Sequence, residues 1–196
     1  GASGGQVGLT IFNTFLENDL SDDKKFNKDF ITAPRAIYSE DFISTSILFL
    51  FGRDMWQGFS PYYIDSPDRA EQIENEWNQA IHSTIGGKED VFTNSFLSYW
   101  YEEKVDTNGF YIKNDNIYKL PLLFLNSTSV ENGNRGIISP VTIDDLFLDS
   151  RDLIDVVHKD TISTFRKSNG ALLGARFPYV SPAGKVADSE HYVDAG

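Results

Sequence analysis

The sequence contains no cysteine among its 196 residues. This absence excludes thiol catalysis, a disulfide framework and zinc sites built on cysteine. Long hydrophobic runs are also missing, because the longest one, from Ile47 to Phe51, is far shorter than the roughly 20 residues that a membrane-spanning helix needs. We therefore expect residues 1–196 to span no membrane.

Basic residues are scarce. The 17 Lys and Arg residues stand against 29 Asp and Glu residues, which gives a net charge of −12. Such a surface repels phosphate backbones, so we expect no nucleic-acid partner. The same charge disfavours purely electrostatic docking on anionic lipid and leaves hydrophobic contact with a membrane open. No metal-ligand spacing stands out, and we expect neither a metal nor an organic cofactor.

Apolar residues are present in an amount that suits one folded domain. Hydrophobic residues make up 40% of the chain and aromatic residues 14%, and no repeat or long linker divides it. The chain starts without an initiator methionine or a basic leader, and we expect it to be a piece of a longer protein. The sequence thus predicts a single domain over residues 1–196, truncated at both ends.

Apolar periodicity predicts where the helices lie. Val7, Ile11 and Phe15 recur at helical spacing, which indicates a helix directly after Ser3. A second, amphipathic helix is expected from Ser66-Pro67 to Gly86-Gly87, because proline favours the first helical position and glycine the end. The remaining helices are predicted over residues 39–56, 92–103 and 161–175, with a loop over residues 18–28.

Two strands and a return strand are expected in the second half of the chain. The stretch "KLPLLFLNSTSV" (119–130) is nearly continuous in apolar residues, as central parallel strands are. The turn residues "ENGNRG" (131–136) and the short run "IISPV" (137–141) then predict a hairpin. The final "HYVDAG" (191–196) is typical of a short strand and a glycine turn. Helices separate the strands, and this pattern indicates an α/β fold.

The first eight residues, "GASGGQVG", carry the pattern G-x-S-x-G around Ser3. This is the pattern of a nucleophilic serine on a sharp turn before a helix. The amide of Gly4 could donate to an oxyanion, and the positive end of the helix dipole would assist it. Glycine and serine are common in this chain, so the motif alone does not exclude a flexible terminus.

A nucleophilic serine needs a base, and the chain offers three histidines and Asp194. We interpret His82 as capping the end of its helix and His158 as a surface or packing residue. His191 is the one candidate for a Ser-Asp-His triad, because the histidine comes last in that order. On a strand, however, His191 and Asp194 point to opposite faces. Asp194 is the better base, since it ends a strand and ligand sites of open α/β sheets lie at such ends.

These motifs resemble those of the patatin-like phospholipases. "GASGGQVG" at residues 1–8 and "YVDAG" at residues 192–196 are similar to that family's G-x-S-x-G and D-G-[GA] motifs, which carry a Ser-Asp dyad. Residues 120–141 look like its central strand and following hairpin, and residues 170–186 look like the helix and turn that lead to the aspartate strand. The four matches occur in the right order, and the resemblance is diffuse over residues 20–118.

The stretch "ARFPYVSPAG" is especially similar to a bacterial branch of this family. The resemblance implies a three-layer α/β/α fold with a mainly parallel central sheet. It also implies that Ser3 is the acylated nucleophile and Asp194 the base of a serine acyl hydrolase. The expected substrates are carboxylic esters of lipids at a membrane surface, as for a phospholipase A or lysophospholipase, and no cofactor takes part.

Two departures from the family pattern bear on activity. The residue after Asp194 is Ala195, where the family usually has glycine. The family's first strand and glycine-rich oxyanion loop lie upstream of the serine and are missing from residues 1–196. Gly4 is then the one oxyanion donor that this chain offers, and we expect the isolated segment to be inactive.

Two other interpretations stay open. One is a conventional α/β-hydrolase with a triad that uses His191, and the other is a catalytically impaired patatin-like domain that binds lipid or serves as a scaffold. Asn126 and Ser127 are possible cleft-lining residues in either case. Arg176 is better explained by a structural ion pair than by substrate binding.

Overall fold

The computed structural model describes residues 4–21, 35, 37, 48, 59, 69–85, 92–105, 111–113, 119–143, 147, 149–157, 165–176, 181–186 and 190–194. Almost all of the helix predicted over residues 39–56 therefore lies outside the described residues. The same holds for His158, which the sequence suggested as a packing histidine.

The described residues form a mixed α/β structure with a five-stranded and a two-stranded sheet. Its helices are α1 (Gly4–Ser21), α5 (Arg69–Ile85), α6 (Leu153–Val157) and α7 (Lys167–Leu173). Its strands are β1 (Tyr101–Val105), β2 (Tyr111–Lys113), β3 (Leu125–Ser129), β4 (Arg135–Ile138), β5 (Ser150–Asp152), β6 (Gly184–Val186) and β7 (Glu190–Asp194).

The five-stranded sheet has the order β5-β4-β3-β7-β6. Its β3–β4, β3–β7 and β6–β7 pairs are antiparallel, and β4–β5 is the parallel pair. The described sheet is therefore chiefly antiparallel and not the mainly parallel sheet that we expected. For the β3–β4 pair the reason is local, because a connection this short, with Gly133 at a φ of 75°, can join only antiparallel neighbours. The pairing of β3 with β7 joins segments that are far apart in the sequence.

The predicted β3–β4 hairpin is confirmed, but its first strand is shorter than expected. Only residues 125–129 pair as a strand, with a buried side chain at every second position. In the preceding apolar segment, Leu122 and Phe124 are exposed. The second half of the apolar run of residues 119–130 thus enters the sheet, whereas its first half exposes two of its large apolar side chains.

Two of the predicted helices are confirmed closely. Helix α1 begins at Gly4, directly after Ser3, and continues to Ser21. The helix therefore includes the first residues of the loop that was predicted over residues 18–28. Helix α5 lies within the range that its proline and glycine boundaries set. Helix α7 occupies the middle of the predicted 161–175 range.

The helix predicted over residues 92–103 is wrong. Residues 92–100 form successive turns, and β1 follows directly at Tyr101. The amide of Phe96 donates to the carbonyl of Phe165, and Phe96 and Trp100 are fully buried. Contact with a segment far along the chain, rather than the local periodicity, decides the conformation here.

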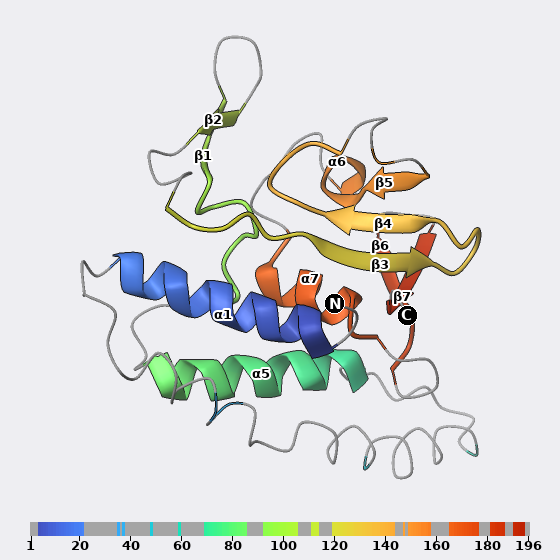
Figure 1. Cartoon of the computed structure of the whole chain (residues 1–196). Helices are drawn as coiled ribbons and strands as arrows, with labels where there is room; N and C mark the ends of the chain where they lie inside the picture. The colour runs from blue at the N-terminus through green and yellow to red at the C-terminus, as the bar shows by residue number, and fades with distance from the viewer. Residues whose placement is uncertain are drawn as a thin grey trace.

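Helices α1, α5 and α7 lie together on one side of the sheet, and the β1–β2 hairpin projects away from it (Figure 1). One hydrophobic core joins these three helices, with Val7, Ile11 and Trp77 among its buried residues. A second core lies around the sheet and includes Trp100 and Tyr192. The helices thereby fix the position of α1 and its first turn relative to β3.

Candidate functional site

The structure places two of the predicted site residues at the ends of elements. Gly4 is the first residue of α1, and Asp194 is the last residue of β7. The first turn of α1 and the end of β7 lie on the same side of the molecule (Figure 1). Ser3 and Ala195, which belong to the two predicted motifs, lie outside the described residues.

Gln6 attaches the first turn of α1 to β3. Its side-chain Nε2 donates to the carbonyl of Asn126 at 2.8 Å, and the amide of Asn126 donates back to Gln6 Oε1 at 2.9 Å. Gln6 is 1% exposed, so this pair of bonds is shielded from water. A buried amide that satisfies both of its polar atoms in this way fixes the helix end at one position on the strand.

Asp194 lies next to that attachment point along β3. It pairs in register with Ser127, which follows Asn126 directly. Successive residues of a strand are about 3.3 Å apart, so Gln6 bonds to β3 just where its pairing with β7 ends. The amide of Asp194 also donates to the carbonyl of Arg176, 2.9 Å away. The aspartate backbone is therefore held on both sides.

Gly174 brings the end of α7 to the same place. A Cβ atom on this residue would lie 2.4 Å from Gln6 Oε1 and 2.7 Å from the carbonyl oxygen of Asn126. Any side chain would collide with the Gln6–Asn126 pair, so the close approach requires glycine. The first turn of α1, the middle of the sheet, the end of α7 and the end of β7 thus converge, and we call this the convergence site.

The helix end at the convergence site is open to an approaching group. Gly4 and Gly5 are exposed, and a Cβ added to either would meet nothing within 4 Å. These two glycines therefore do not serve to pack α1 closely against the sheet. The first amides of a helix lack intrahelical acceptors and carry its positive dipole, and no acidic residue occupies the first turn of α1. These amides could therefore stabilise an anion.

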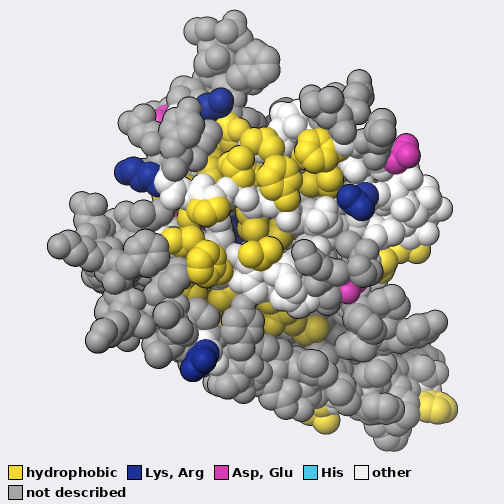
Figure 2. Space-filling model, viewed as in Figure 1, with side chains coloured by type: hydrophobic (Ala, Val, Ile, Leu, Met, Phe, Trp, Pro, Cys, Tyr) yellow, Lys and Arg dark blue, Asp and Glu magenta, His cyan; other side chains and the backbone are white. Residues whose placement is uncertain are grey.

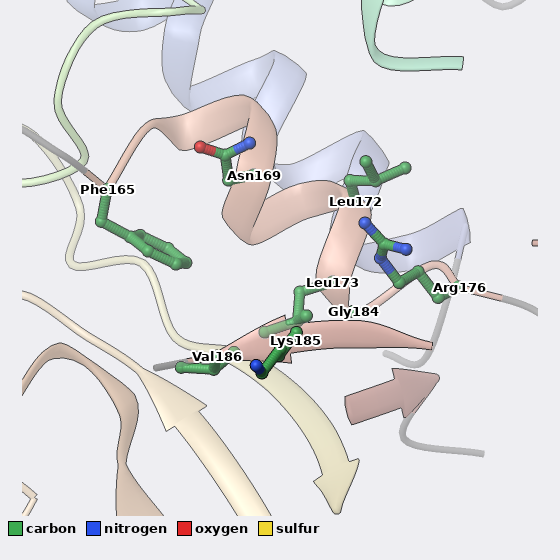
Figure 3. A pocket seen from close by; sticks show the side chains of 8 residues that line it. All are labelled: Phe165, Asn169, Leu172, Leu173, Arg176, Gly184, Lys185 and Val186. Carbon is green, nitrogen blue, oxygen red and sulfur yellow. The ribbon is translucent and has the colours of Figure 1, made fainter. Parts of the chain in front are cut away.

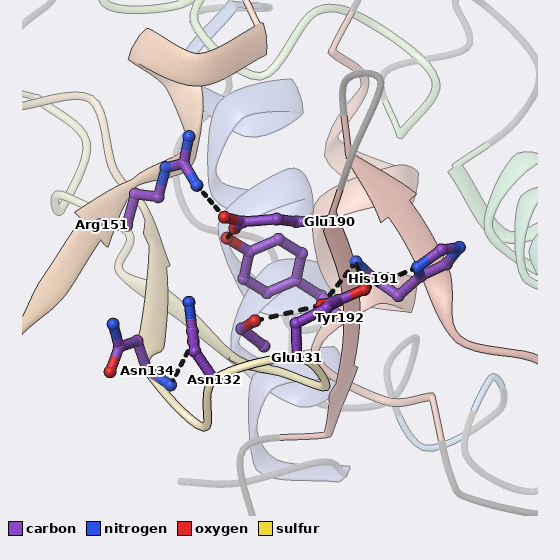
Figure 4. Close-up of polar contacts among 8 residues, drawn as sticks. Glu131, Asn132, Asn134, Arg151, Glu190, His191 and Tyr192 are labelled. Atoms are coloured by element: carbon purple, nitrogen blue, oxygen red, sulfur yellow. Dashed lines mark hydrogen bonds and ion pairs between the residues drawn. The ribbon is translucent and has the colours of Figure 1, made fainter.

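His191 lies at the opposite end of β7 and is exposed. Its Nδ1 is 2.8 Å from Glu131 Oε1, and its backbone amide donates to both carboxylate oxygens of Glu131 (Figure 4). His191 and Asp194 are three positions apart along the strand, which places their Cα atoms about 10 Å apart. The structure therefore does not bring His191 to the aspartate, and the imidazole has a different partner.

The hydrogen bond from His191 is the main reason that the pKa of Glu131 falls from an ordinary value of 4.5 to about 2. Glu190 accepts in a similar way from Tyr192 and forms an ion pair with Arg151. These contacts connect β5, β7 and the β3–β4 turn (Figure 4). They lie at the opposite end of β3 and β7 from the convergence site.

A cavity of about 290 Å³ lies between α7 and β6, and Leu173 of α7 and Lys185 of β6 are among the residues that line it (Figure 3). Arg176 connects the cavity to the convergence site, because its side chain lines the cavity and its carbonyl accepts the bond from Asp194. Its Nη1 donates to the carbonyl of Pro182 at 2.7 Å. This is a structural contact to a backbone carbonyl, and the structural ion pair expected of Arg176 stays a prediction.

The sequence interpretation missed Gln6, which attaches the first turn of α1 to β3. A glutamine in the first turn of a helix carries no special signal in one sequence, and its two bonds reach a residue 120 positions away. Asn126, which the sequence offered as a possible cleft-lining residue, uses its backbone for this contact. His82 lies exposed in the last turn of α5, where it was predicted.

Within the part of the chain that the structure describes, no cluster of three or more His, Asp or Glu side chains is arranged to hold a metal ion. None of the described helices combines the length and apolar character needed to cross a bilayer. A scan against protein-family models, a search of curated proteins and a search of solved structures each found no match.

Proposed function

We propose that this chain is the core of a patatin-like serine acyl hydrolase that cleaves carboxylic esters of lipids. The convergence site supports the proposal, because it joins the two ends of the chain that carry the G-x-S-x-G and aspartate motifs. Ser3 is bonded covalently to Gly4, and Gly4 begins the helix that Gln6 holds beside the Ser127–Asp194 pair. The three-layer α/β/α arrangement is part of this proposal.

In the proposed reaction, the Asp194 carboxylate takes the proton of the Ser3 hydroxyl while the serine oxygen attacks the ester carbonyl. The amide of Gly4 donates to the oxyanion that forms on the carbonyl oxygen. Collapse of this intermediate expels the alcohol, which leaves with the proton, and a serine ester remains. Asp194 then takes a proton from water, whose attack releases the fatty acid and restores Ser3.

Substitution of either dyad residue tests this function. We expect Ser3→Ala and Asp194→Asn to reduce lipid ester hydrolysis by at least about 1000-fold, since members of a catalytic unit act together. The assay uses the full-length protein, because the family's oxyanion loop lies upstream of its serine motif. Circular dichroism and the unfolding midpoint should stay unchanged.

Two exposed residues provide matched controls. Ser83→Ala on α5 and Asp155→Asn on α6 make the same chemical changes away from the convergence site, and both variants should keep full activity. A serine-reactive fluorophosphonate probe should label the wild type and the Ser83→Ala variant but not Ser3→Ala. Full activity of Ser3→Ala or Asp194→Asn would disprove the dyad.

The same assay separates the two alternatives. A His191→Gln variant should remain active, because His191 contacts Glu131 rather than Asp194. Its inactivation, with the fold retained, would favour a triad that uses histidine. Full-length protein that neither hydrolyses esters nor reacts with the probe would favour a lipid-binding or scaffold domain.

A further inference from the structure

Large hydrophobic side chains are exposed together on the face of the molecule that α1 occupies. Figure 2 shows hydrophobic side chains gathered over the middle of this face. Five residues from three segments expose between 38% and 50% of their surface, namely Leu9, Phe12, Leu122, Phe124 and Phe147. We call these five residues the apolar face.

The three segments of the apolar face lie next to one another. Leu9 and Phe12 are one turn apart and share a side of α1. The neighbouring Asn13 donates from Nδ2 to the carbonyl of Pro121 at 3.2 Å, which places α1 beside the segment that holds Leu122. The rings of Phe124 and Phe147 stack with centroids 6.5 Å apart. The exposed side chains are therefore continuous rather than scattered.

Core packing does not account for this face. The opposite side of α1 provides the core, with Val7, Ile11 and Phe15 buried against α5 and α7. A helix at the surface of a globular protein normally turns polar residues to solvent, whereas α1 exposes Leu9 and Phe12. Exposed apolar surface of this kind typically marks a surface that another molecule covers.

The charges around the apolar face indicate what covers it. In Figure 2, side chains of both signs, Lys and Arg as well as Asp and Glu, lie around the hydrophobic area, and among the described residues no Asp or Glu lies within it. A border of mixed charge suits a zwitterionic headgroup, which carries both signs. Lys119 is exposed directly before the apolar segment that leads into β3. Lysines at such a border can reach lipid phosphates while leucine and phenylalanine enter the acyl region. The net charge of −12 opposes a strongly anionic membrane.

We infer that the apolar face docks this protein on a zwitterionic phospholipid surface. The purpose of this docking rests on the proposed function. Helix α1 begins at Gly4, five residues before Leu9, so docking would hold its first turn close to ester groups at that surface. The binding itself requires only the exposed side chains. Docking and hydrolysis can therefore be measured separately.

The test is flotation of the full-length protein with phosphatidylcholine vesicles, in a Ser3→Ala background so that no lipid is consumed. We expect the protein to float with the vesicles. The pairs Leu9→Gln with Phe12→Gln, on the helix, and Leu122→Ser with Phe124→Ser, before β3, should each weaken partitioning at least about tenfold. Val130→Ser is the matched control, because Val130 is 57% exposed in the β3–β4 turn outside the apolar face.

Adding phosphatidylserine should weaken binding, and salt should partly restore it, because the protein is acidic. The inference would be overturned if the Ser3→Ala protein did not float with the vesicles, or if all variants bound the vesicles equally. So would a concentration-dependent dimer in sedimentation that Leu122→Ser with Phe124→Ser dissociates, since a second copy would then cover this face. Vesicle binding by a wild type that hydrolyses no ester would support docking and contradict the proposed dyad.

Discussion

At the scale of single residues, the most unusual side chain is Lys167. It is fully buried at the first position of α7 and forms an ion pair with Glu17 of α1. Burial removes water from the ammonium group and lowers the pKa of Lys167 to about 7. A charge in this position is tolerated because its partner is buried with it.

Removing one member of this pair should be costly. We expect Glu17→Gln to lower the free energy of unfolding by about 3–5 kcal/mol, since Lys167 would lose its buried partner and would have to carry an unpaired charge or release its proton. The double variant Glu17→Leu with Lys167→Met should recover most of the loss, because neither charge then remains. Urea denaturation monitored by tryptophan fluorescence measures both effects. A double variant no more stable than Glu17→Gln would contradict this account.

At the scale of elements, helix α7 organises the helical side of the fold through its two ends. Ser168 and Asn169, in its first turn, donate to the carboxylate of Glu74 on α5. Gly174, at its other end, contacts Gln6 and Asn126. A seven-residue helix thereby holds α1, α5 and β3 in fixed positions, which is why its polar residues are buried.

Gly174→Ala should separate elements that now touch. Its Cβ would overlap Gln6 Oε1, so we expect a loss of about 1–3 kcal/mol in unfolding free energy, together with a fall in any ester hydrolysis. Gly5→Ala is a stability control, because it adds the same methyl group to open space within α1. That change should stabilise the protein by about 0.5–1 kcal/mol. Thermal unfolding would show opposite shifts, and equal shifts would argue against the packing described at Gly174.

The β3–β4 turn and β7 are coupled by the contact between Glu131 and His191. The pKa of Glu131 is about 2 in the folded protein, below its ordinary value of 4.5. A carboxyl group with a lowered folded-state pKa binds its proton more readily in the unfolded chain. Its contribution to stability is therefore complete above about pH 4.5 and is lost as the pH falls toward 2.

Replacement of His191 by alanine should raise the pKa of Glu131 toward 4.5, because it removes the largest cause of the shift. Carbon-detected NMR of the Glu131 carboxyl over pH 2–6 measures this change directly. The shift should be partial, since the backbone amide of residue 191 remains as a donor. The Glu102 carboxyl, exposed on β1, serves as the reference. An unchanged Glu131 titration would show that the imidazole does not interact with it in solution.

At the scale of the whole molecule, chain ends that are far apart in sequence meet at one place. The order β5-β4-β3-β7-β6 puts the last strand beside β3, and the three packed helices bring the first turn of α1 to the same strand. The apolar face occupies the side of α1 that does not enter the core. The molecule therefore presents a helix end and an exposed hydrophobic surface in the same region, which is the arrangement that the proposed hydrolysis and docking need.

The sequence by itself determined the features that depend on neighbouring residues. The helical period after Ser3, the proline and glycine around α5 and the turn residues between β3 and β4 each act locally, so these elements could be predicted. It also indicated the two motifs, the acidic surface and the absence of thiol chemistry.

Only the tertiary structure decided the features that depend on contacts between distant segments. These include the antiparallel pairing of Ser127 with Asp194 and the bonds between Gln6 and Asn126. They also include the turns at residues 92–100, where burial and a hydrogen bond to Phe165 replace the predicted helix. The bonding of His191 to Glu131 belongs to the same class. The free energy of each arrangement comes from groups that the local sequence does not contain, because burial and hydrogen bonding are completed only when the segments meet.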